Sequence, residues 1–263
     1  MKPAVHKRLT EVAIALCGER LSSEMRSFAS EIAKGSVYED NVSLERLFNW
    51  HFYRSADSTI PRRFYGFMRP TSEHILLKHI QKMLRHGKKE RERYEQLGRV
   101  LHHIQDMSTP SHVLAIYHDP ATIDQFEAFV EVHLDTIAGD GTIVPINSES
   151  DGGLAGIYHR AAEQTRRYVT HGTFEATEHG TPKQLPLTRF WHDFHEDEDP
   201  RRRGFGMFGD LHECFNPVGG TERCPYEITL HTLLKIQEHF CRRAIADSCL
   251  ALLYADAHAS PPA

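Results

Sequence analysis

The sequence predicts an all-α fold, a single-domain multi-helix bundle with long ordered loops. Apolar residues recur at helical spacing in several long segments, and no convincing series of alternating strand patterns interrupts them. The chain has 263 residues, of which 40% are hydrophobic and 25% charged, as is usual for one large globular domain. We expect residues 1–257 to form this domain and residues 258–263 to form a disordered tail.

The first helix is expected over residues 4–20, where Leu9, Ala13 and Leu16 share one face. His6 lies three residues before Leu9, so it falls on the same inner face. The remaining helices are expected over residues 23–34, 72–107 with a break near 86–89, 122–138, 153–171 and 226–257.

Two segments lack a clear period and are expected to be loops, residues 36–71 and a long ordered excursion over residues 172–225. Gly35 is the expected C-cap of the helix over residues 23–34.

The net charge is −5, which does not indicate a broad nucleic-acid-binding surface. No apolar run approaches the roughly 20 residues that span a bilayer. The N-terminal segment is too charged and too periodic for a signal peptide, so the chain as given is expected in the cytoplasm, with a secreted or periplasmic location as the open alternative. Among five cysteines there is no CxxC pair, but Cys214 and Cys224 flank a Gly/Pro loop and could pair in an oxidising compartment.

Histidine is over-represented, with 19 residues, and three of them lie in the stretch LHHIQDMSTPSH (residues 101–112). His102 and Asp106 are four residues apart on the helix, so they project from one face. A carboxylate on a buried face is costly unless it is paired. Either a His–Asp hydrogen bond at a helix end or a divalent cation held by both side chains would satisfy it.

Two further features of this stretch favour the metal site. Gly98 lies one turn before His102, where the missing side chain leaves room. The helix should end before Pro110, which places His112 on the exit loop, able to turn back toward the site. Candidate ligands in other segments are His6, Glu39, Asp40, His51, His118, Asp124 and Glu127.

In combination, these residues resemble the zinc-dependent phospholipase C family of bacteria, which shares its fold with fungal single-strand 3′-nucleases. The resemblance covers residues 5–131, about half the chain. LHHIQDMSTPSH is its most specific element, NWHFY (residues 49–53) matches a family HFY segment, and VHKRLTEVAI (residues 5–14) matches the first-helix histidine. It implies a metal-binding cleft between helices that holds two to three zinc ions.

The resemblance also assigns ligands. One zinc would take Asp40 or Glu39 together with His51, His102 and Asp106. Asp106 would bridge to a second zinc held by His6, and the remaining zinc would take His112 and Glu127. The family pairs that glutamate with a histidine four residues earlier, where this chain has Ile123. Asp124 and His118 are the two candidates for its place.

A second departure concerns the N-terminus. The family has a tryptophan about a dozen residues before the first histidine, whose backbone binds one zinc, whereas five residues and no tryptophan precede His6. That zinc is therefore expected to be weakened, differently ligated or missing if Met1 is the true start.

The resemblance implies that metal-activated water cleaves a phosphodiester, with Asp40 as the residue that orients or deprotonates this water. Tyr38, Phe52 and Tyr53 are candidate substrate-binding residues, although Phe52 and Tyr53 are equally compatible with core packing beside the ligands. His103 is expected to play a supporting role, and His74 and His79 to lie on the surface.

Phosphatidylcholine-like lipid is the expected substrate, cleaved to diacylglycerol by a monomer in peripheral contact with a membrane and without stable nucleic-acid binding. A 3′-nuclease or nucleotidase on the same zinc scaffold is the alternative substrate class. An HD-type phosphohydrolase, which has no place for the spacing of His102, Asp106 and His112, is a more distant alternative. The non-enzyme hypothesis is a helical protein with degenerate metal sites.

Overall fold

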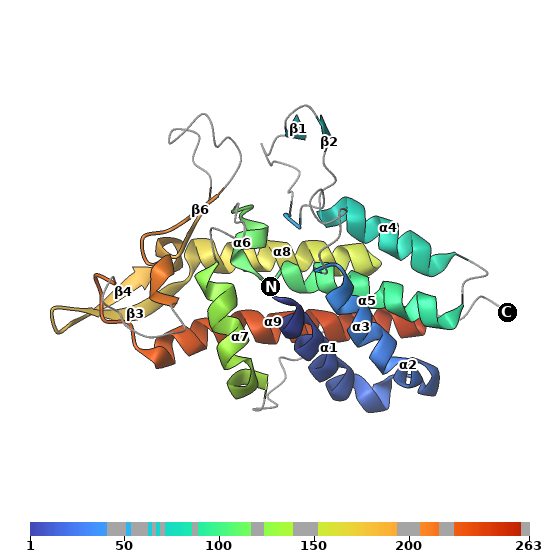
Figure 1. Cartoon of the computed structure of the whole chain (residues 1–263). Coiled ribbons are helices and arrows are strands. Elements are labelled where there is room, and N and C mark those ends of the chain that lie inside the picture. The colour runs from blue at the N-terminus through green and yellow to red at the C-terminus, as the bar shows by residue number, and fades with distance from the viewer. Residues whose placement is uncertain are drawn as a thin grey trace.

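Helices make up most of the described part of the chain in the computed structural model (Figure 1). The structure describes residues 1–40, 51–53, 63–64, 67–68, 72–85, 89–116, 124–138, 152–193, 206–215 and 224–258. Its α-helices are α1 (Pro3–Cys17), α2 (Ser23–Ser27), α3 (Ala29–Tyr38), α4 (Ser72–Leu84), α5 (Glu90–Asp106), α6 (Pro110–Val113), α7 (Gln125–Ala138), α8 (Gly153–His171) and α9 (Leu230–Ala257).

Several predicted helices are confirmed, and α8 has the predicted limits. The break predicted near residues 86–89 separates α4 from α5. The helix predicted over residues 23–34 is wrong at its end, because α3 continues through Gly35 to Tyr38. His112 was expected on a loop but lies on the short helix α6, which begins at Pro110, where proline needs no backbone hydrogen bond.

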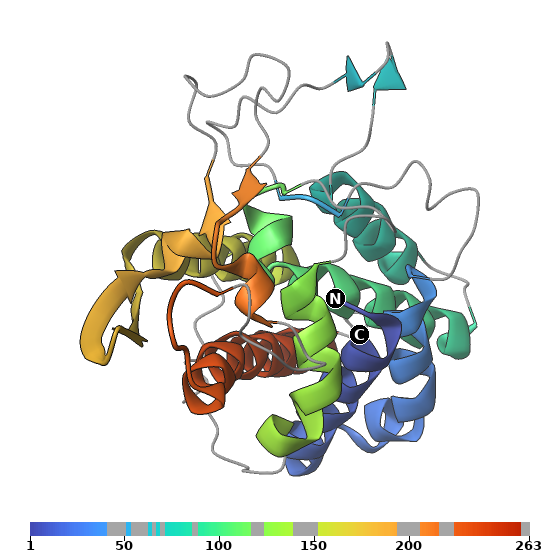
Figure 2. The ribbon, with the colours of Figure 1, turned by 60° about the vertical axis from the view of Figure 1, so that its left-hand side comes forward.

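The long helix α9 lies at the centre of the packing and contacts α1, α5, α7 and α8 (Figures 1 and 2). One continuous hydrophobic cluster joins these helices, and Leu9, Leu101, Ile157 and Leu252 are fully buried in it. Each such side chain contributes roughly 1.5–3 kcal/mol to stability when it leaves water. This apolar base positions the ends of α1 and α5, where the candidate ligands lie.

Helices α3 and α5 approach each other closely at two glycines. A Cβ atom added to Gly98 would lie 2.7 Å from the Gly35 Cα and 2.1 Å from the backbone oxygen of Ile32. Because only hydrogen fits between the two backbones, Gly35 acts as a contact point within α3 and not as the predicted C-cap.

The segment after α8 contains strands that were not predicted. Strand β3 (Thr173–Glu178) pairs antiparallel with β4 (Thr181–Pro186). The turn between them places His179 and Gly180 at positive φ, as a two-residue hairpin requires. The other described strands form two short antiparallel pairs, β1 (Arg63–Phe64) with β2 (Phe67–Met68) and β5 (Trp191–His192) with β6 (Met207–Phe208).

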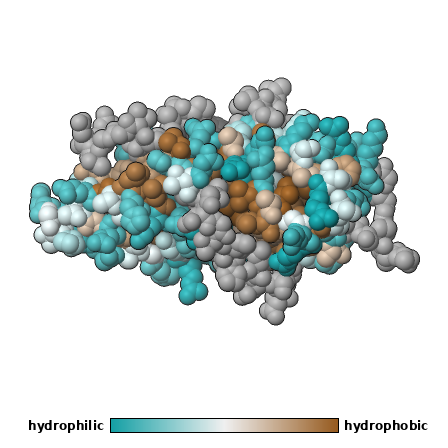
Figure 3. All heavy atoms as spheres, turned by 90° about the horizontal axis from the view of Figure 1, so that it is seen from below, coloured by the Kyte–Doolittle hydropathy of each residue, from teal (hydrophilic) through white to brown (hydrophobic). Residues whose placement is uncertain are grey.

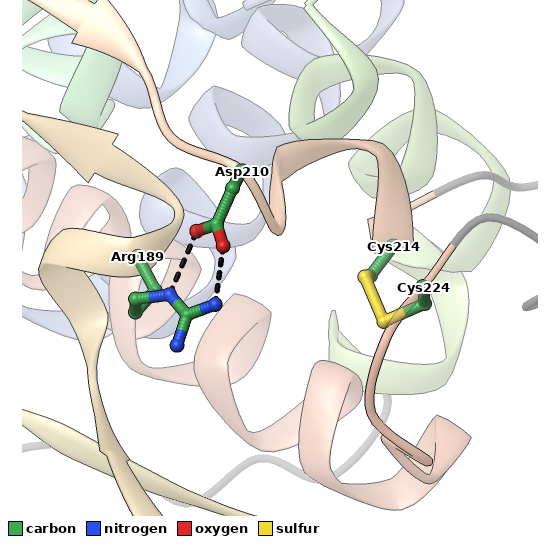
Figure 4. Close-up of a disulfide and its surroundings, with 4 residues drawn as sticks. All are labelled: Arg189, Asp210, Cys214 and Cys224. Carbon is green, nitrogen blue, oxygen red and sulfur yellow. Dashed lines mark hydrogen bonds and ion pairs between the residues drawn. A yellow bond between two sulfur atoms is a disulfide. The ribbon is translucent and has the colours of Figure 1, made fainter.

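A disulfide and an ion pair link parts of the chain that follow this hairpin (Figure 4). Cys214 and Cys224 form a disulfide with their Cα atoms 5.6 Å apart, which confirms the pairing proposed from sequence. Arg189 donates two hydrogen bonds to Asp210, one of them 2.7 Å long. The disulfide joins residues 10 positions apart in the sequence, and the ion pair joins residues 21 positions apart. Both links therefore hold together the segment between the hairpin and α9.

The surface is mixed in polarity. In the view of Figure 3, apolar residues are visible in the middle of the molecule and polar residues toward its periphery. Within the described ranges, no helix combines the length and apolarity needed to cross a bilayer.

Candidate metal centre

Asp106, fully buried at the last position of α5, lies at the centre of the candidate site. Its two carboxylate oxygens face two different pairs of histidines. Oδ1 lies 3.3 Å from His6 Nε2 and 3.7 Å from His112 Nε2. Oδ2 lies 3.1 Å from His51 Nδ1 and 3.3 Å from His102 Nε2. A carboxylate with histidine nitrogens on both sides has the arrangement needed to bridge two cations.

Two sets of these side chains bring their ligand atoms close enough to hold a metal ion. His51, His102 and Asp106 form one set, and His6, Asp40 and His102 form the other, with the ligand atoms of each set within 4.8 Å of one another. Asp40 Oδ2 lies 3.8 Å from His6 Nε2. Mixed nitrogen and oxygen donors suit zinc and related transition metals.

The histidines are oriented by hydrogen bonds on their opposite ring nitrogens. His6 Nδ1 donates to Gln105 Oε1 at 2.8 Å, and His102 Nδ1 donates to the Ser36 carbonyl at 2.9 Å. His112 Nδ1 donates to the carbonyl of His51 at 3.0 Å. Because these oxygens can only accept, the proton of each neutral imidazole is on Nδ1 and the Nε2 lone pair faces Asp106. This is the usual outer-shell arrangement of metal-binding histidines.

The metal-free site is strongly charged. Burial would raise the pKa of Asp106, but positive charge on His112 and His102 holds it well below its ordinary value. Burial opposes protonation of His102, but the carboxylates of Asp106 and Asp40 outweigh it and raise its pKa to about 9. By contrast, burial lowers the pKa of His6. Since ligands must be deprotonated, a cation bound here displaces the His102 proton.

Glu127, on the first turn of α7, joins the Oδ1 side of the cluster. Its Oε1 lies 3.2 Å from His112 Nε2 and 2.8 Å from the α-amino nitrogen of Met1. That nitrogen lies 3.4 Å from Asp106 Oδ1. Burial lowers the pKa of this α-amino group, but the carboxylates of Glu127 and Asp106 outweigh it and raise the pKa to about 11, so the metal-free chain places a second carboxylate and a positively charged ammonium on this side of Asp106.

Asp124 has different surroundings. Its Oδ1 accepts the backbone N–H groups of Phe126 and Glu127 at the start of α7, and it lies 3.3 Å from His212 Nε2. The side chain thus acts as a helix cap, which satisfies amides that have no partner within the helix. The other candidate for this position, His118, lies outside the described residues.

The two candidates for the loop carboxylate ligand, Asp40 and Glu39, lie in different clusters. Asp40 lies with His6 and His102, whereas Glu39 contacts His79 at 3.2 Å and Arg99 at 2.9 Å. The prediction that His79 is a surface residue is wrong, because it is 3% exposed. A hydrogen bond from its Nδ1 to Gln96 Oε1 at 2.8 Å satisfies one of its two buried ring nitrogens.

The three aromatic candidates lie at different depths. Tyr53 is buried, and its hydroxyl donates to Glu163 at 3.1 Å. The half-buried ring of Phe52 lies 6.1 Å from that of His112. Tyr38 is 46% exposed and stacks on the Arg99 guanidinium, 3.9 Å from the ring centre. Phe52 is therefore the candidate nearest to a cluster histidine among these measured contacts.

Comparison with protein-family models, with curated proteins and with solved structures finds no match.

Gln105 is the functional residue that the sequence analysis missed. Besides accepting from His6, its amide donates to Thr10 Oγ1 at 2.9 Å and Ser248 Oγ at 3.1 Å. A fully buried glutamine needs partners for both ends of its amide, but the sequence shows only that Gln105 precedes Asp106 and not that it is buried.

Replacing Gln105 with leucine is expected to lower zinc affinity about 10–100-fold, the usual effect of removing an outer-shell partner. His6 loses the acceptor that fixes its ring and tautomer. Zinc titration against a competing chelator measures the change. The control is Gln164→Leu at an exposed position on α8, which should leave affinity unchanged. Equal affinity in Gln105→Leu and wild type would contradict the orienting role.

Proposed function

We propose that this protein is a zinc-dependent phosphodiester hydrolase of the phospholipase C type, which cleaves a phosphatidylcholine-like lipid to diacylglycerol and a phosphorylated head group. The observation that carries the proposal is the position of Asp106, whose two oxygens face separate histidine pairs. The residues fit zinc, because the His6 Nε2 that faces Asp106 is buried without a hydrogen-bond partner among the described residues.

Zinc bound here supplies Lewis acidity for a phosphate ester and lowers the pKa of water toward neutrality. Asp106, His51 and His102 would hold it on one side, and Asp106, His6 and His112 on the other. Ions of this charge offset the carboxylates of the site and favour an anionic diester. With metal and water present, no side-chain nucleophile is required.

Asp40 is the proposed group that orients the attacking water or accepts its proton. Its carboxylate is 6% exposed and lies beside His6 and His102 at the edge of the cluster. A carboxylate in this position accepts a hydrogen bond from water and aligns the oxygen with phosphorus. Phe52, beside His112, would contact the head group, with Tyr38 and Tyr53 as further candidates.

The HD-type alternative receives less support from the structure. It needs an adjacent histidine and aspartate to bind one metal, and the sequence offers two such pairs. His118–Asp119 lies outside the described residues, and in His192–Asp193 the Asp193 Oδ2 accepts two hydrogen bonds from Arg166, at 3.0 and 3.2 Å. That carboxylate is therefore already engaged in an ion pair away from the Asp106 cluster.

The test combines metal analysis with substrate comparison. Protein purified without a histidine tag should contain at least two zinc ions per chain and release phosphorylated head groups from phosphatidylcholine vesicles. A His102→Ala variant should lose zinc and lower hydrolysis by more than about 100-fold, since even outer-shell changes cost about 10–100-fold. His74→Ala, an exposed histidine on α4, is the matched control.

Two outcomes would contradict the proposal. Faster cleavage of 3′-nucleotides or single-stranded nucleic acid than of vesicles would replace the lipid substrate with the nuclease alternative. If the protein binds no metal and zinc does not raise its melting temperature, the proposal of a zinc-dependent hydrolase is wrong.

A further inference from the structure

A second histidine and carboxylate group lies beside the Asp106 cluster. Glu39 follows α3, His79 is on α4, and His103 is on α5. All three side chains are buried, and their ligand atoms lie within 4.8 Å of one another. Three separate helical elements therefore bring one oxygen and two nitrogen donors to a single place.

Both histidines point Nε2 at the carboxylate. His79 Nδ1 donates to Gln96 Oε1 at 2.8 Å, and His103 Nδ1 lies 3.1 Å from Ser72 Oγ. His79 Nε2 lies 3.2 Å from Glu39 Oε1, and His103 Nε2 lies 4.0 Å from Glu39 Oε2. Because an amide oxygen can only accept, a neutral His79 carries its proton on Nδ1 and presents its Nε2 lone pair toward Glu39. His103 does the same when its Nδ1 donates to the Ser72 hydroxyl, which can either donate or accept.

These Nε2 atoms lack hydrogen-bond partners in the part of the chain that the structure describes, although both are buried. Buried polar atoms without partners cost about 1–3 kcal/mol each. The 4.0 Å between His103 and Glu39 is too long for a hydrogen bond. A cation between these atoms would satisfy both nitrogens and the free side of the carboxylate.

The distances fit a small ion. Ligand atoms about 2.0–2.2 Å from one tetrahedral zinc lie roughly 3.3–3.6 Å from one another. His79 Nε2 lies 3.2 Å from Oε1 and His103 Nε2 lies 4.0 Å from Oε2, so the two distances involve different oxygens of Glu39 and lie on either side of that range. Two imidazole nitrogens and one carboxylate oxygen are also a donor set that zinc accepts, with water in the fourth position.

Arg99 is the main electrostatic argument against a cation, because its Nη1 lies 2.9 Å from Glu39 Oε1. The guanidinium uses only that oxygen in the measured bond and is also 3.6 Å from Glu95. Ligating carboxylates are themselves commonly held by hydrogen bonds from neighbouring groups. Arg99 therefore orients Glu39, while Oε2 remains turned toward His103.

We propose that Glu39, His79 and His103 bind a transition-metal ion, zinc by their donor chemistry, in a structural site separate from the ions of the Asp106 cluster. This ion links α4 to α5 and to the end of α3. It also fixes Glu39, which immediately precedes Asp40, and His103, which immediately follows His102. The site thus supports two residues of the neighbouring cluster through the backbone.

The first experiment isolates this site by removing the other. The double variant His102→Ala/Asp106→Asn is stripped with chelator, titrated with zinc alone and examined as the whole chain by native mass spectrometry. It should retain one zinc ion, which the additional change His79→Leu removes. Adding His74→Leu, an exposed histidine on the same helix, should leave that zinc in place. A double variant that binds no zinc would overturn the proposal.

A second measurement uses the otherwise unchanged chain. His79→Leu should bind one zinc fewer than wild type and gain correspondingly less in melting temperature when zinc is added. A purely structural Glu39–His79 ion pair would lower the melting temperature equally with and without zinc, and this result would also overturn the proposal. Because residual zinc in the double variant is independent of hydrolysis, failure of this site and failure of the proposed function are distinguishable.

Discussion

Asp106→Asn is expected to release the zinc of the central cluster and to lower phosphodiester hydrolysis by more than about 100-fold, beyond the loss typical of an outer-shell change. The substitution preserves the shape of the side chain but replaces one oxygen with an NH₂ group. In the wild type, the Asp106 carboxylate faces four histidine nitrogens, two at each oxygen. An amide has no charge to offset two cations and directs hydrogens toward one pair of nitrogens.

Asp106→Asn is also expected to change how the free energy of unfolding of chelator-treated protein depends on pH. Asp106 and Asp40 raise the pKa of His102 to about 9 against the opposing effect of burial. A histidine whose folded pKa is raised stabilises the fold fully below its unfolded value, about 6.5, and this contribution is lost as pH rises toward 9. The free energy of unfolding of the metal-free wild type should therefore fall between pH 6.5 and 9, and this fall should be smaller in Asp106→Asn.

His6 and His51 do not oppose this fall in the free energy of unfolding above pH 6.5. Burial lowers the pKa of His6 and His51, so their linkage acts below pH 6.5, where stability falls as they protonate. Urea denaturation at pH 6.5 and 9, together with zinc analysis, measures both signatures. Asp135→Asn, on a 91% exposed side chain, is the control. Retained zinc and unchanged hydrolysis in Asp106→Asn would remove Asp106 from the centre of the site.

The sequence predicts the part of the site that lies within one helix. His102 and Asp106 are four residues apart, and the structure places His102 Nε2 3.3 Å from Asp106 Oδ2, as the helical repeat requires. The approach of His6 and His51 depends on how α1 and the segment before α4 pack. Spacing along the chain does not determine such packing, so the sequence offers these residues as candidates and only the family resemblance assigns them to one site.

Burial of individual polar residues was harder to predict. His79 lies on the same face of α4 as the buried Ile75, Leu76 and Met83, whereas His74 lies on the exposed face, so the helical spacing carried a signal for its burial. The approach of its Nε2 to Glu39 Oε1, at 3.2 Å, depends on the packing of separate helices and is not visible in the sequence. Likewise, the β3–β4 hairpin was missed because most of its β4 residues are polar and exposed, which hides the alternation that identifies a strand. The turn at His179 and Gly180 was its only clear local signal.

Gly98→Ala is expected to lower the free energy of unfolding by about 1–3 kcal/mol or more, the usual range for overpacked cores. Its new Cβ would lie 2.1 Å from the Ile32 oxygen, 2.7 Å from the Gly35 Cα and 2.8 Å from the Ser36 nitrogen. These are all backbone atoms, so no side chain can rotate away, and α3 must shift as a unit. Gly18→Ala is the control, because its added Cβ would meet nothing within 4 Å.

The position of Ser36 connects this packing to the metal centre. Its carbonyl accepts the His102 Nδ1 hydrogen at 2.9 Å, one residue after Gly35. A shifted α3 should therefore weaken zinc binding as well as the fold. The sequence alone suggested that Gly98 leaves room for an ion, and under that hypothesis alanine would reduce zinc affinity without destabilising chelator-treated protein. Urea denaturation of metal-free Gly98→Ala separates the two, because close contact between the helices predicts a loss of stability before any metal is added.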